Sequence, residues 1–480
     1  MARHPLAALA LTRGRGPPLQ RQLVEGVKAL VQRGAIRPGD ALPSTRDLAA
    51  ELRVSRNTTS AAYDQLVSEG YLEARPRSGV FVSGALAGRL RDPGPAGPAR
   101  ARLPEAPPLP PLSSPPPFRP CYPDVRLFPL ALWNRCRARA LREHGPALLH
   151  YQPHPLGLPA LRRALAEYLG ASRGVRCTWE QIAITTGSQQ ALYLLARVLL
   201  GPGKPALIED PGYPGAREAF RSTGADLRPI PVDGDGLVPP ARLPRGAVVY
   251  TTPSRQFPTG APLPVARRLA LLASAEAAGA WIVEDDYDSE YRYTRAPLPS
   301  LHGLDGGGRV VYVGTTSKVL APALRIGYLV LPPELVERFA AVRTVVDEHG
   351  PLVDQATLAA FLDAGAFYGH LRRCRREYAG RLDAFLSVAR EVGAPLEFRH
   401  ADSGMNLLGR FTAPPRDPAG QRRRLAEAGF SVPTLEPYLL EPDGPAGHRV
   451  HPAALFFGFS AFTSGAIRQA WRRLGPLLAR

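Results

Sequence analysis

The sequence GTTSKVLAPALRIGYLVLP occupies residues 314–332 and contains Lys318, one of three lysines in a chain with 60 lysine and arginine residues. A partly buried lysine can lose its proton and attack an aldehyde, whereas arginine stays protonated and cannot form a Schiff base. An apolar strand-like run, residues 310–313, precedes a short segment of small and hydroxylated residues that ends at Lys318. The sequence therefore predicts a tight turn, rich in hydrogen-bond donors, that presents an amine. A lysine in a surface loop is the simpler alternative.

From about residue 118 onwards, short apolar segments alternate with longer segments of helical periodicity. The predicted strands are residues 206–209, 247–251, 281–284, 310–313 and 327–331. Alternation of this kind predicts a parallel sheet with helices on both faces, which is an α/β fold. Ligands of such sheets bind at the carboxyl ends of the strands, so we expect the functional side chains of this region to lie there.

Three motifs place polar or aromatic groups at predicted strand ends and helix starts. Residues 186–190, TGSQQ, precede a helical segment, and such groups at a helix N-terminus favour an anion. Asp285 ends a buried strand, where a carboxylate is costly unless it meets a cation such as a protonated pyridine nitrogen, and Tyr287 lies on the same side. Tyr213 in PGYP could stack on a ring. Each motif alone has a simpler explanation: an ordinary helix start, solvated acids in a loop, or a rigid turn.

The order of these motifs resembles the fold-type I enzymes that use pyridoxal 5'-phosphate (PLP), the aspartate aminotransferase superfamily. The resemblance rests on TTGSQQALYLLARVLL, EDPGYPGAR, TPSRQFPTG, EDDYDSEYRY and GTTSKVLAPALRIGYLVLP. It implies that Lys318 forms a Schiff base with PLP, the internal aldimine. It also implies that Asp285 pairs with the pyridine nitrogen, that Tyr287 reaches the ring oxygen and that Tyr213 stacks on the ring. The further cofactor-binding residues that it implies are Ser188, Gln189, Thr315, Ser317 and Arg325, together with Tyr151, which reaches the phosphate of the partner subunit.

Two positions depart from the aminotransferase pattern. Many aminotransferases have an asparagine in an NPTG turn that touches the ring oxygen, whereas residues 256–260 of this chain are QFPTG. The family often places an arginine before LGFS to hold a substrate carboxylate, and this chain has Phe456 there. Bidentate capture of a carboxylate is then lost. The expected ligand becomes PLP itself, or an amine that is apolar or differently held, with Arg449 as an alternative carboxylate partner.

The N-terminal region has the pattern of three helices followed by a hairpin. The first helix is predicted over residues 19–34, the second after the N-cap Ser44 and the third after the N-cap Ser55. The third helix has a polar first turn and an apolar stripe later, as expected of a helix whose N-terminal end enters a DNA major groove. Residues 71–74 and 80–82 predict two strands with a basic tip that suits phosphates or a minor groove.

This region resembles the winged helix-turn-helix of the GntR regulators. The resemblance rests on residues 37–82, RPGDALPSTRDLAAELRVSRNTTSAAYDQLVSEGYLEARPRSGVFV. It implies that Arg46 and the turn at residues 55–58 face DNA, although a three-helix packing domain without a DNA role is an alternative. The residues expected at the DNA are Ser44, Thr45, Arg46, Ser55, Arg56, Asn57, Thr58, Arg75, Arg77, Ser78 and Gly79.

A proline-rich segment, residues 84–117, separates the two regions and predicts a semi-rigid linker. Such a linker allows two DNA-binding heads to reach separated half-sites, or it acts as a passive tether. The expected domains are a winged helix-turn-helix over residues 1–83, the linker, and residues 118–480. The last domain is expected to have the α/β fold of type I PLP-dependent transferases with a C-terminal α/β subdomain, and to mediate dimerisation.

A GntR head joined to an aminotransferase-like body is the layout of the MocR/GabR regulators. The resemblance implies a PLP-dependent transcription regulator that forms a head-to-tail homodimer, binds double-stranded operator DNA and senses PLP or an amine or amino-acid effector at Lys318. Two alternatives remain open at this point. One is an active aminotransferase with an accessory DNA-binding domain, and the other is a DNA-binding protein whose body is only a dimerisation scaffold.

The composition sets wider bounds on function. The formal net charge of +18 fits a polyanionic partner, although the excess of arginine also follows from the coding composition of a genome. The four cysteines are scattered and lack zinc-site spacing, which favours a reducing compartment and no metal site. The apolar run within residues 1–11 is too short for a secretory signal, and residues 191–200, interrupted by Arg197, are too short to span a bilayer. We expect a cytoplasmic protein.

Overall fold

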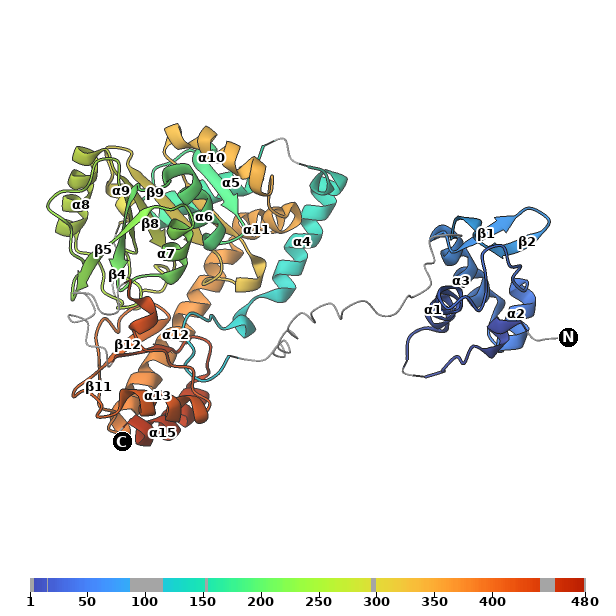
Figure 1. The fold of residues 1–480 in the computed structure, drawn as a ribbon. Helices are drawn as coiled ribbons and strands as arrows, with labels where there is room; N and C mark the ends of the chain where they lie inside the picture. The colour runs from blue at the N-terminus through green and yellow to red at the C-terminus, as the bar shows by residue number, and fades with distance from the viewer. Residues whose placement is uncertain are drawn as a thin grey trace. The chain divides into compact units, whose positions relative to one another are not determined.

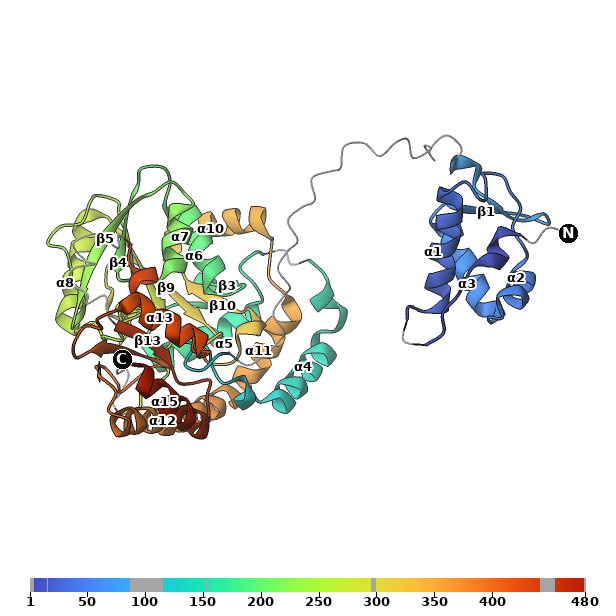
Figure 2. The same cartoon turned by 60° about the horizontal axis from the view of Figure 1, so that its bottom comes forward.

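The computed structural model describes residues 4–14, 16–86, 115–151, 154–294, 299–440 and 454–478. The chain forms two compact units, Met1–Pro111 and Leu112–Arg480, which we call the head and the body (Figures 1 and 2). Most of the predicted linker lies outside the described residues, and its first three residues, Gly84–Leu86, form a short 3-10 helix.

The head consists of three helices and an antiparallel hairpin. Its elements are α1 (Leu19–Gln32), α2 (Thr45–Leu52), α3 (Arg56–Ser68), β1 (Leu72–Arg75) and β2 (Gly79–Val82). Ser44 Oγ accepts a hydrogen bond from the backbone N–H of Asp47 at 3.2 Å, and Ser55 Oγ accepts one from Thr58 at 3.1 Å. These bonds satisfy amide groups at the helix starts and confirm the two predicted N-caps.

One apolar core joins these elements. Its fully buried members include Leu23, Val27, Leu48, Leu66 and Val82. The apolar run that precedes α1 belongs to the same core, because Pro5–Ala8 form a 3-10 helix, η1, in which Leu6 is fully buried. The buried residues of the head core therefore extend from Leu6 to Val82.

The body is built on an eight-stranded sheet of order β3-β10-β9-β8-β7-β4-β5-β6. The strands are β3 (Ile182–Thr185), β4 (Pro205–Asp210), β5 (Asp226–Asp233), β6 (Gly236–Leu237), β7 (Val248–Thr251), β8 (Trp281–Asp286), β9 (Val310–Thr315) and β10 (Gly327–Val330). The five predicted strands are β4, β7, β8, β9 and β10, whereas β3 and β5 were not predicted.

The prediction of a parallel sheet is wrong at two strands. β10 runs antiparallel to both of its neighbours, β9 and β3, and the two-residue β6 runs antiparallel to β5. The connection from β9 to β10, residues 316–326, contains only a short 3-10 turn, Pro322–Leu324. A parallel return would need a crossover of about a dozen residues or more, usually a helix, so this shorter connection brings the chain back in the opposite direction.

Helices cover both faces of the sheet, as predicted. α6 (Ser188–Leu199), α7 (Pro214–Arg221) and α10 (Pro333–Val346) pack on one face together with Val248, Tyr250 and Val283. α8 (Val265–Ala278) packs on the other face with the alternate residues Val249 and Ile282 (Figure 2). Alternate strand residues point to opposite faces, so both sets are apolar and the sheet is buried on both sides.

A smaller subdomain follows the long helix α12 (Ala366–Glu391). It contains the antiparallel strands β11 (Leu396–Phe398), β12 (Asn406–Phe411) and β13 (Ala454–Gly458), with α13 (Pro418–Glu427) and α15 (Ser464–Leu478). Trp471 is fully buried among Phe385, Phe398 and Phe457. Three further helices of the body are α4 (Leu130–His144), α5 (Pro159–Arg173) and α11 (Leu352–Asp363).

No helix in the described part of the chain is long and apolar enough to cross a membrane.

Replacing Leu66 with alanine should destabilise the head by about 2–5 kcal/mol, because it removes a fully buried side chain from the core and leaves a cavity. Thermal unfolding followed by circular dichroism, with hydrogen exchange of α3, measures the loss. Val67→Ala is the matched control, since the Val67 side chain is 36% exposed on the same helix. Equal effects of the two substitutions would contradict this core.

Candidate functional site

A cavity of about 240 Å³ lies at the carboxyl ends of β7, β8 and β9, beside the N-terminus of α6. The structure brings nine of the predicted cofactor-site residues to its wall: Ser188, Gln189, Tyr213, Asp285, Tyr287, Thr315, Ser317, Lys318 and Arg325. Tyr151 does not line it, and its side chain is 83% exposed. One cavity is thus lined by an amine, a carboxylate, a guanidinium, hydroxyls and aromatic rings.

Lys318 lies three residues beyond the end of β9. Its Nζ donates a hydrogen bond to the carbonyl oxygen of Cys121 at 2.9 Å, and the hydroxyl of Tyr291 donates to the carbonyl oxygen of Lys318 at 3.1 Å. The turn is therefore held from the backbone while the half-buried amine reaches the cavity. An amine in this position can act as a nucleophile after it loses its proton.

The carboxylate of Asp285 is buried at the end of β8 and is 4% exposed. Its Oδ2 accepts a hydrogen bond from Tyr250 at 2.7 Å, whereas its Oδ1 has no hydrogen-bond partner among the described residues. Burial raises the pKa of Asp285 to about 7, while the bond from Tyr250 acts in the opposite direction. An unpartnered carboxylate oxygen in this cavity is suited to a ligand that donates a proton or carries positive charge.

Groups suited to a negatively charged ligand, rather than a positively charged one, lie at the start of α6. Arg325 donates to the carbonyl oxygen of Thr186 at 2.8 Å, which fixes its guanidinium beside the helix N-terminus. Gly187 has φ +97°, which favours glycine, and a Cβ there would lie 3.0 Å from Arg325 Nη2, so a larger residue would be strained here and would crowd the guanidinium. The start of this helix, the hydroxyls of Ser188 and Ser317, and an arginine are together suited to an anion such as phosphate.

Five residues of the cavity wall were missed by the sequence analysis, namely Cys121, Tyr250, Thr252, Phe257 and Pro322. Tyr250 and Thr252 lie at the carboxyl end of β7, and the parallel-sheet rule applied to that predicted strand could have found them. Cys121 is distant in sequence and reaches the cavity only through tertiary contacts, so no local signal marks it.

Phe257, next to the departure at Gln256, and Phe456 belong to one apolar cluster, which we call the apolar wall; Phe257 lines the cavity and Phe456 does not. Gln256 turns its amide to Glu209 and to the carbonyl oxygens of Pro211 and Phe257, so the neighbouring Phe257 lines the cavity instead. Phe456 is buried, with its ring centroid 5.4 Å from Phe257 and 5.6 Å from Tyr438. The alternative partner Arg449 lies outside the described residues.

In the head, the residues predicted to contact DNA lie on the surface. Arg46 is exposed in the first turn of α2, and Ser55, Arg56 and Asn57 are exposed at the start of α3. Thr58 is half-buried, because its hydroxyl bonds to Ser55 at 2.8 Å. The structure thus presents a polar α3 N-terminus, while Tyr63 and Leu66 of the same helix are buried in the core.

The tip of the hairpin is also exposed and basic. Arg77 has φ +63° and points from the turn between β1 and β2, next to Ser78 and Gly79. Arg75 differs from Arg77, because it pairs with Glu73 at 2.6 Å and lies 4.4 Å from the centroid of Phe81. Arg77 is therefore the arginine of this tip with more freedom to reach a phosphate.

In the described residues, no group of three or more potential ligands could hold a metal ion.

Replacing Asp285 with asparagine should change how the stability of the cofactor-free protein depends on pH. The pKa of a free aspartate is about 3.9, so the raised pKa of Asp285 means that its stabilising contribution is present below about pH 4 and lost as pH rises towards 7. At about pH 8 the variant should exceed the parent by at most about 4 kcal/mol in the free energy of unfolding, and below pH 4 by almost nothing. Denaturant unfolding of the body at both pH values measures the difference. The exposed Asp383→Asn is the control, and a pH-independent difference for Asp285→Asn would refute the assignment.

Comparisons with known proteins agree with the division of the chain into a head and a body. Residues 134–441 match the aminotransferase class I and II family, and residues 19–82 match the bacterial regulatory proteins of the gntR family. The probable rhizopine catabolism regulatory protein MocR of Rhizobium meliloti is 40% identical over 417 residues, which cover 84% of each chain. The HTH-type transcriptional regulator TauR of Rhodobacter capsulatus is 41% identical over 405 residues, 81% of this chain and 83% of TauR.

A solved structure resembles the body. The α-aminoadipate aminotransferase LysN of Thermus thermophilus, complexed with N-(5'-phosphopyridoxyl)-L-leucine, superposes with a TM-score of 0.66 at 30% identity. The match covers 75% of this chain and 91% of LysN. The chain therefore belongs to the MocR/GabR-type transcription regulators, in which a GntR-type DNA-binding head is joined to a body of the aminotransferase class I and II family.

Proposed function

We propose that this regulator binds PLP in the Lys318 cavity and controls transcription in response to PLP or to an amine that reacts there. The observation that carries the proposal is the unpartnered Oδ1 of Asp285, buried in the same cavity as Lys318 and Arg325. A protonated pyridine nitrogen supplies the missing donor, and its positive charge favours the ionised carboxylate.

The remaining cavity residues fit the other parts of PLP. Arg325, Ser188 and Ser317 would hold the phosphate, with Gln189 and Thr315 beside them. Tyr213 supplies an aromatic face, and its hydroxyl lies 3.3 Å from Gln189 Oε1. Tyr287 would reach the ring oxygen. PLP, when bound, supplies an electrophilic carbon for amines, and Lys318 is the chain's own amine in this cavity.

The apolar wall supports a particular class of effector. Phe257, Phe456 and Tyr438 pack edge to face where an aminotransferase would hold a substrate carboxylate. An open groove of about 680 Å³ shares Cys121, Tyr213 and Phe257 with the Lys318 cavity, and Tyr438 and Phe430 also line it. Burial of a carboxylate against these rings would lack a donor. The effector is therefore PLP alone, an amine with an apolar body, or an amine whose carboxylate is held away from these rings, as by Arg119 of the groove.

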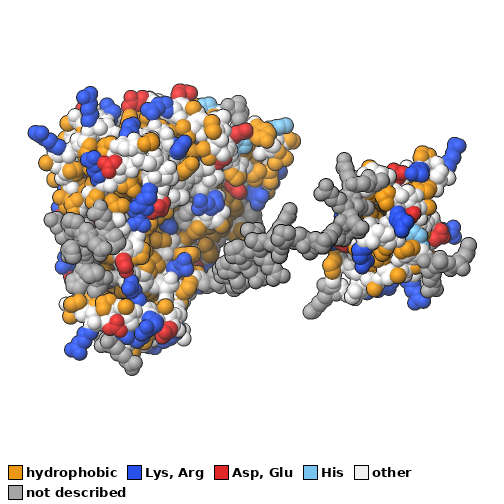
Figure 3. Space-filling model, viewed as in Figure 1, with side chains coloured by type: hydrophobic (Ala, Val, Ile, Leu, Met, Phe, Trp, Pro, Cys, Tyr) orange, Lys and Arg blue, Asp and Glu red, His pale blue; other side chains and the backbone are white. Residues whose placement is uncertain are grey.

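A homodimer is part of this proposal. Leu141, Leu149 and Tyr151 are exposed at and after the C-terminal end of α4, and Leu149 is 78% exposed. Figure 3 shows hydrophobic side chains gathered at the edge of the body where α4 ends. Exposed apolar patches of this kind favour a protein interface. In a head-to-tail dimer, Tyr151 would reach the phosphate of the PLP bound by the partner subunit.

Lys318→Ala should abolish covalent attachment of PLP to the protein. The chain has only Lys28, Lys204 and Lys318 as lysines, so borohydride reduction followed by peptide mass spectrometry identifies the attachment site without ambiguity. The parent and the control Lys204→Ala should carry a pyridoxyl group on the Lys318 peptide and show visible absorbance that primary amines alter. Attachment at Lys204, or unlabelled parent protein, would overturn the assignment. A keto acid supplied with an amino acid also tests the aminotransferase alternative, because sustained turnover would favour it.

Two head substitutions should separate base recognition from phosphate contact. Arg56→Ala, at the start of α3, should cost about 1–3 kcal/mol in discrimination between operator and mutated operator DNA. Arg77→Ala should weaken binding to all sequences alike and reduce the slope of log K against log salt by about 1. Fluorescence anisotropy at several salt concentrations measures both. Arg33→Ala is the control, because Arg33 is exposed at the end of α1 and was not assigned to DNA. Equal behaviour of the Arg56 and Arg77 variants would contradict these roles.

A further inference from the structure

A second cavity, of about 530 Å³, opens on the body between the C-terminal end of α5, the segment after β8 and the first turns of α12. None of its lining residues lines the Lys318 cavity. Its volume falls in the range of about 300–1,000 Å³ that is usual for small-molecule sites. The function proposed for the Lys318 cavity does not involve this second cavity.

The floor of this second cavity has an acceptor without a donor. Glu290 is 9% exposed, and its Oε1 accepts a hydrogen bond from Tyr168 at 3.1 Å. Its Oε2 has no hydrogen-bond partner in the described part of the chain, and the same holds for Ser289 Oγ. Burial raises the pKa of Glu290 to about 7. Buried carboxylate oxygens normally have partners, so this one points to a missing donor.

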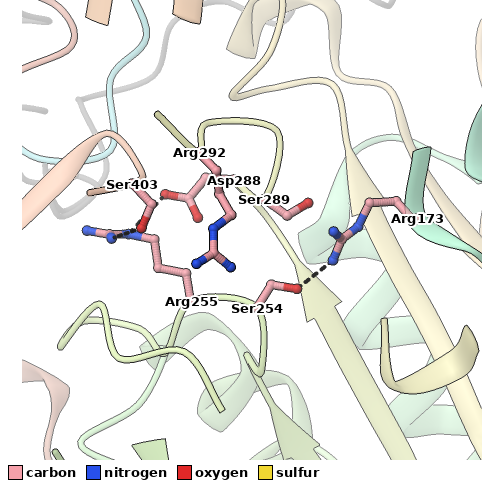
Figure 4. Close-up of a pocket in the computed structure, with 7 residues that line it drawn as sticks. All are labelled: Arg173, Ser254, Arg255, Asp288, Ser289, Arg292 and Ser403. Atoms are coloured by element: carbon pink, nitrogen blue, oxygen red, sulfur yellow. Dashed lines mark hydrogen bonds and ion pairs between the residues drawn. The ribbon is translucent and has the colours of Figure 1, made fainter. Parts of the chain in front are cut away.

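The neighbouring arginine on the inner wall is already engaged. Arg173 pairs with Asp286 at 2.7 Å and donates to Ser254 Oγ at 2.6 Å. Figure 4 shows Ser289 between Arg173 and Arg292, at a small polar cavity of about 10 Å³. A space of that volume holds about one water molecule, so an organic ligand has room only in the larger cavity.

The rim carries positive charge. Arg372 and Arg375 lie one turn apart on α12 and line the cavity together with Tyr368, whose side chain is 44% exposed. Neither arginine forms an ion pair with an acidic residue that the structure describes. Arg375 donates through Nε to the carbonyl oxygen of Glu290, which holds it beside the floor. Guanidinium groups with free N–H donors are suited to a carboxylate.

We propose that this cavity binds a small zwitterion with a primary ammonium group and a carboxylate. The ammonium group donates to Glu290 Oε2 and Ser289 Oγ, and the carboxylate pairs with Arg372 and Arg375. A simple amine leaves the two arginines unpaired, and a simple carboxylate places no donor on Glu290. This site therefore selects a ligand with both charges, unlike the apolar wall beside Lys318.

The test is isothermal titration calorimetry of the full-length, PLP-loaded protein with glycine, β-alanine, 4-aminobutyrate and 6-aminohexanoate. Cofactor absorbance is recorded in parallel, because binding at Lys318 changes it and binding at Glu290 does not. We expect saturable heat from at least one zwitterion without an absorbance change. Butylamine and butyrate, each with one of the two charges, should bind at least about tenfold more weakly.

Variants of the two ends locate the site. Glu290→Gln keeps the shape of the side chain, and Arg372→Gln alters an exposed residue. Each should weaken the zwitterion about tenfold or more, whereas Arg376→Gln, exposed on the same helix outside the cavity, should not. No saturable binding by any zwitterion, or binding that both variants leave unchanged, would overturn the proposal. Heat that always accompanies an absorbance change would assign the ligand to Lys318 instead.

Discussion

The body of this protein is organised by the need to compensate buried negative charge at the end of β8. Residues 284–290 contain five acidic side chains, all at most 9% exposed. The carboxylate of Glu284 accepts hydrogen bonds from the backbone N–H groups of Leu301 and His302, and Asp286 forms an ion pair with Arg173. Asp288 lies 3.5 Å from Arg255. A buried charge without a partner costs several kcal/mol, so these contacts fix α5, the loop after β7 and the start of α9 (Leu301–Leu304) around one strand end.

Asp285 and Glu290 are the two acids of this segment that each keep one oxygen without a donor while lining a ligand-sized cavity. These two are therefore the acids of the segment that a ligand in a neighbouring cavity could satisfy. The reversal of β10 contributes to the same arrangement. The short return after β9 places Lys318 and Arg325 in one connection, and the close contact of Gly327 with Gly187 brings this connection to the start of α6.

Much of this arrangement could be predicted from sequence, because local patterns carry it. The caps at Ser44 and Ser55, the alternation of strands and helices, and the family motifs around Lys318 and Asp285 are all contained in short segments. The direction of β10 could not be predicted from strand patterning, since it depends on the length of one connection. Cys121 entered the site through contacts between distant segments, whereas Tyr250 lies at the end of a predicted strand and could have been found there. Glu290 was not singled out from the sequence, because only its burial distinguishes it from an ordinary acid in a loop.

The head core and the body sheet also differ in the point during synthesis of the chain at which all of their residues are present. The head core needs only residues from Leu6 to Val82, whereas the body sheet cannot close its β3 edge until β10, at residues 327–330, has been made. At a synthesis rate of about 5–20 residues per second, roughly 12–50 s separate these two points. A nascent chain on the ribosome therefore carries a complete head before it carries a complete sheet. The DNA-binding head is therefore complete before the body can respond to a ligand.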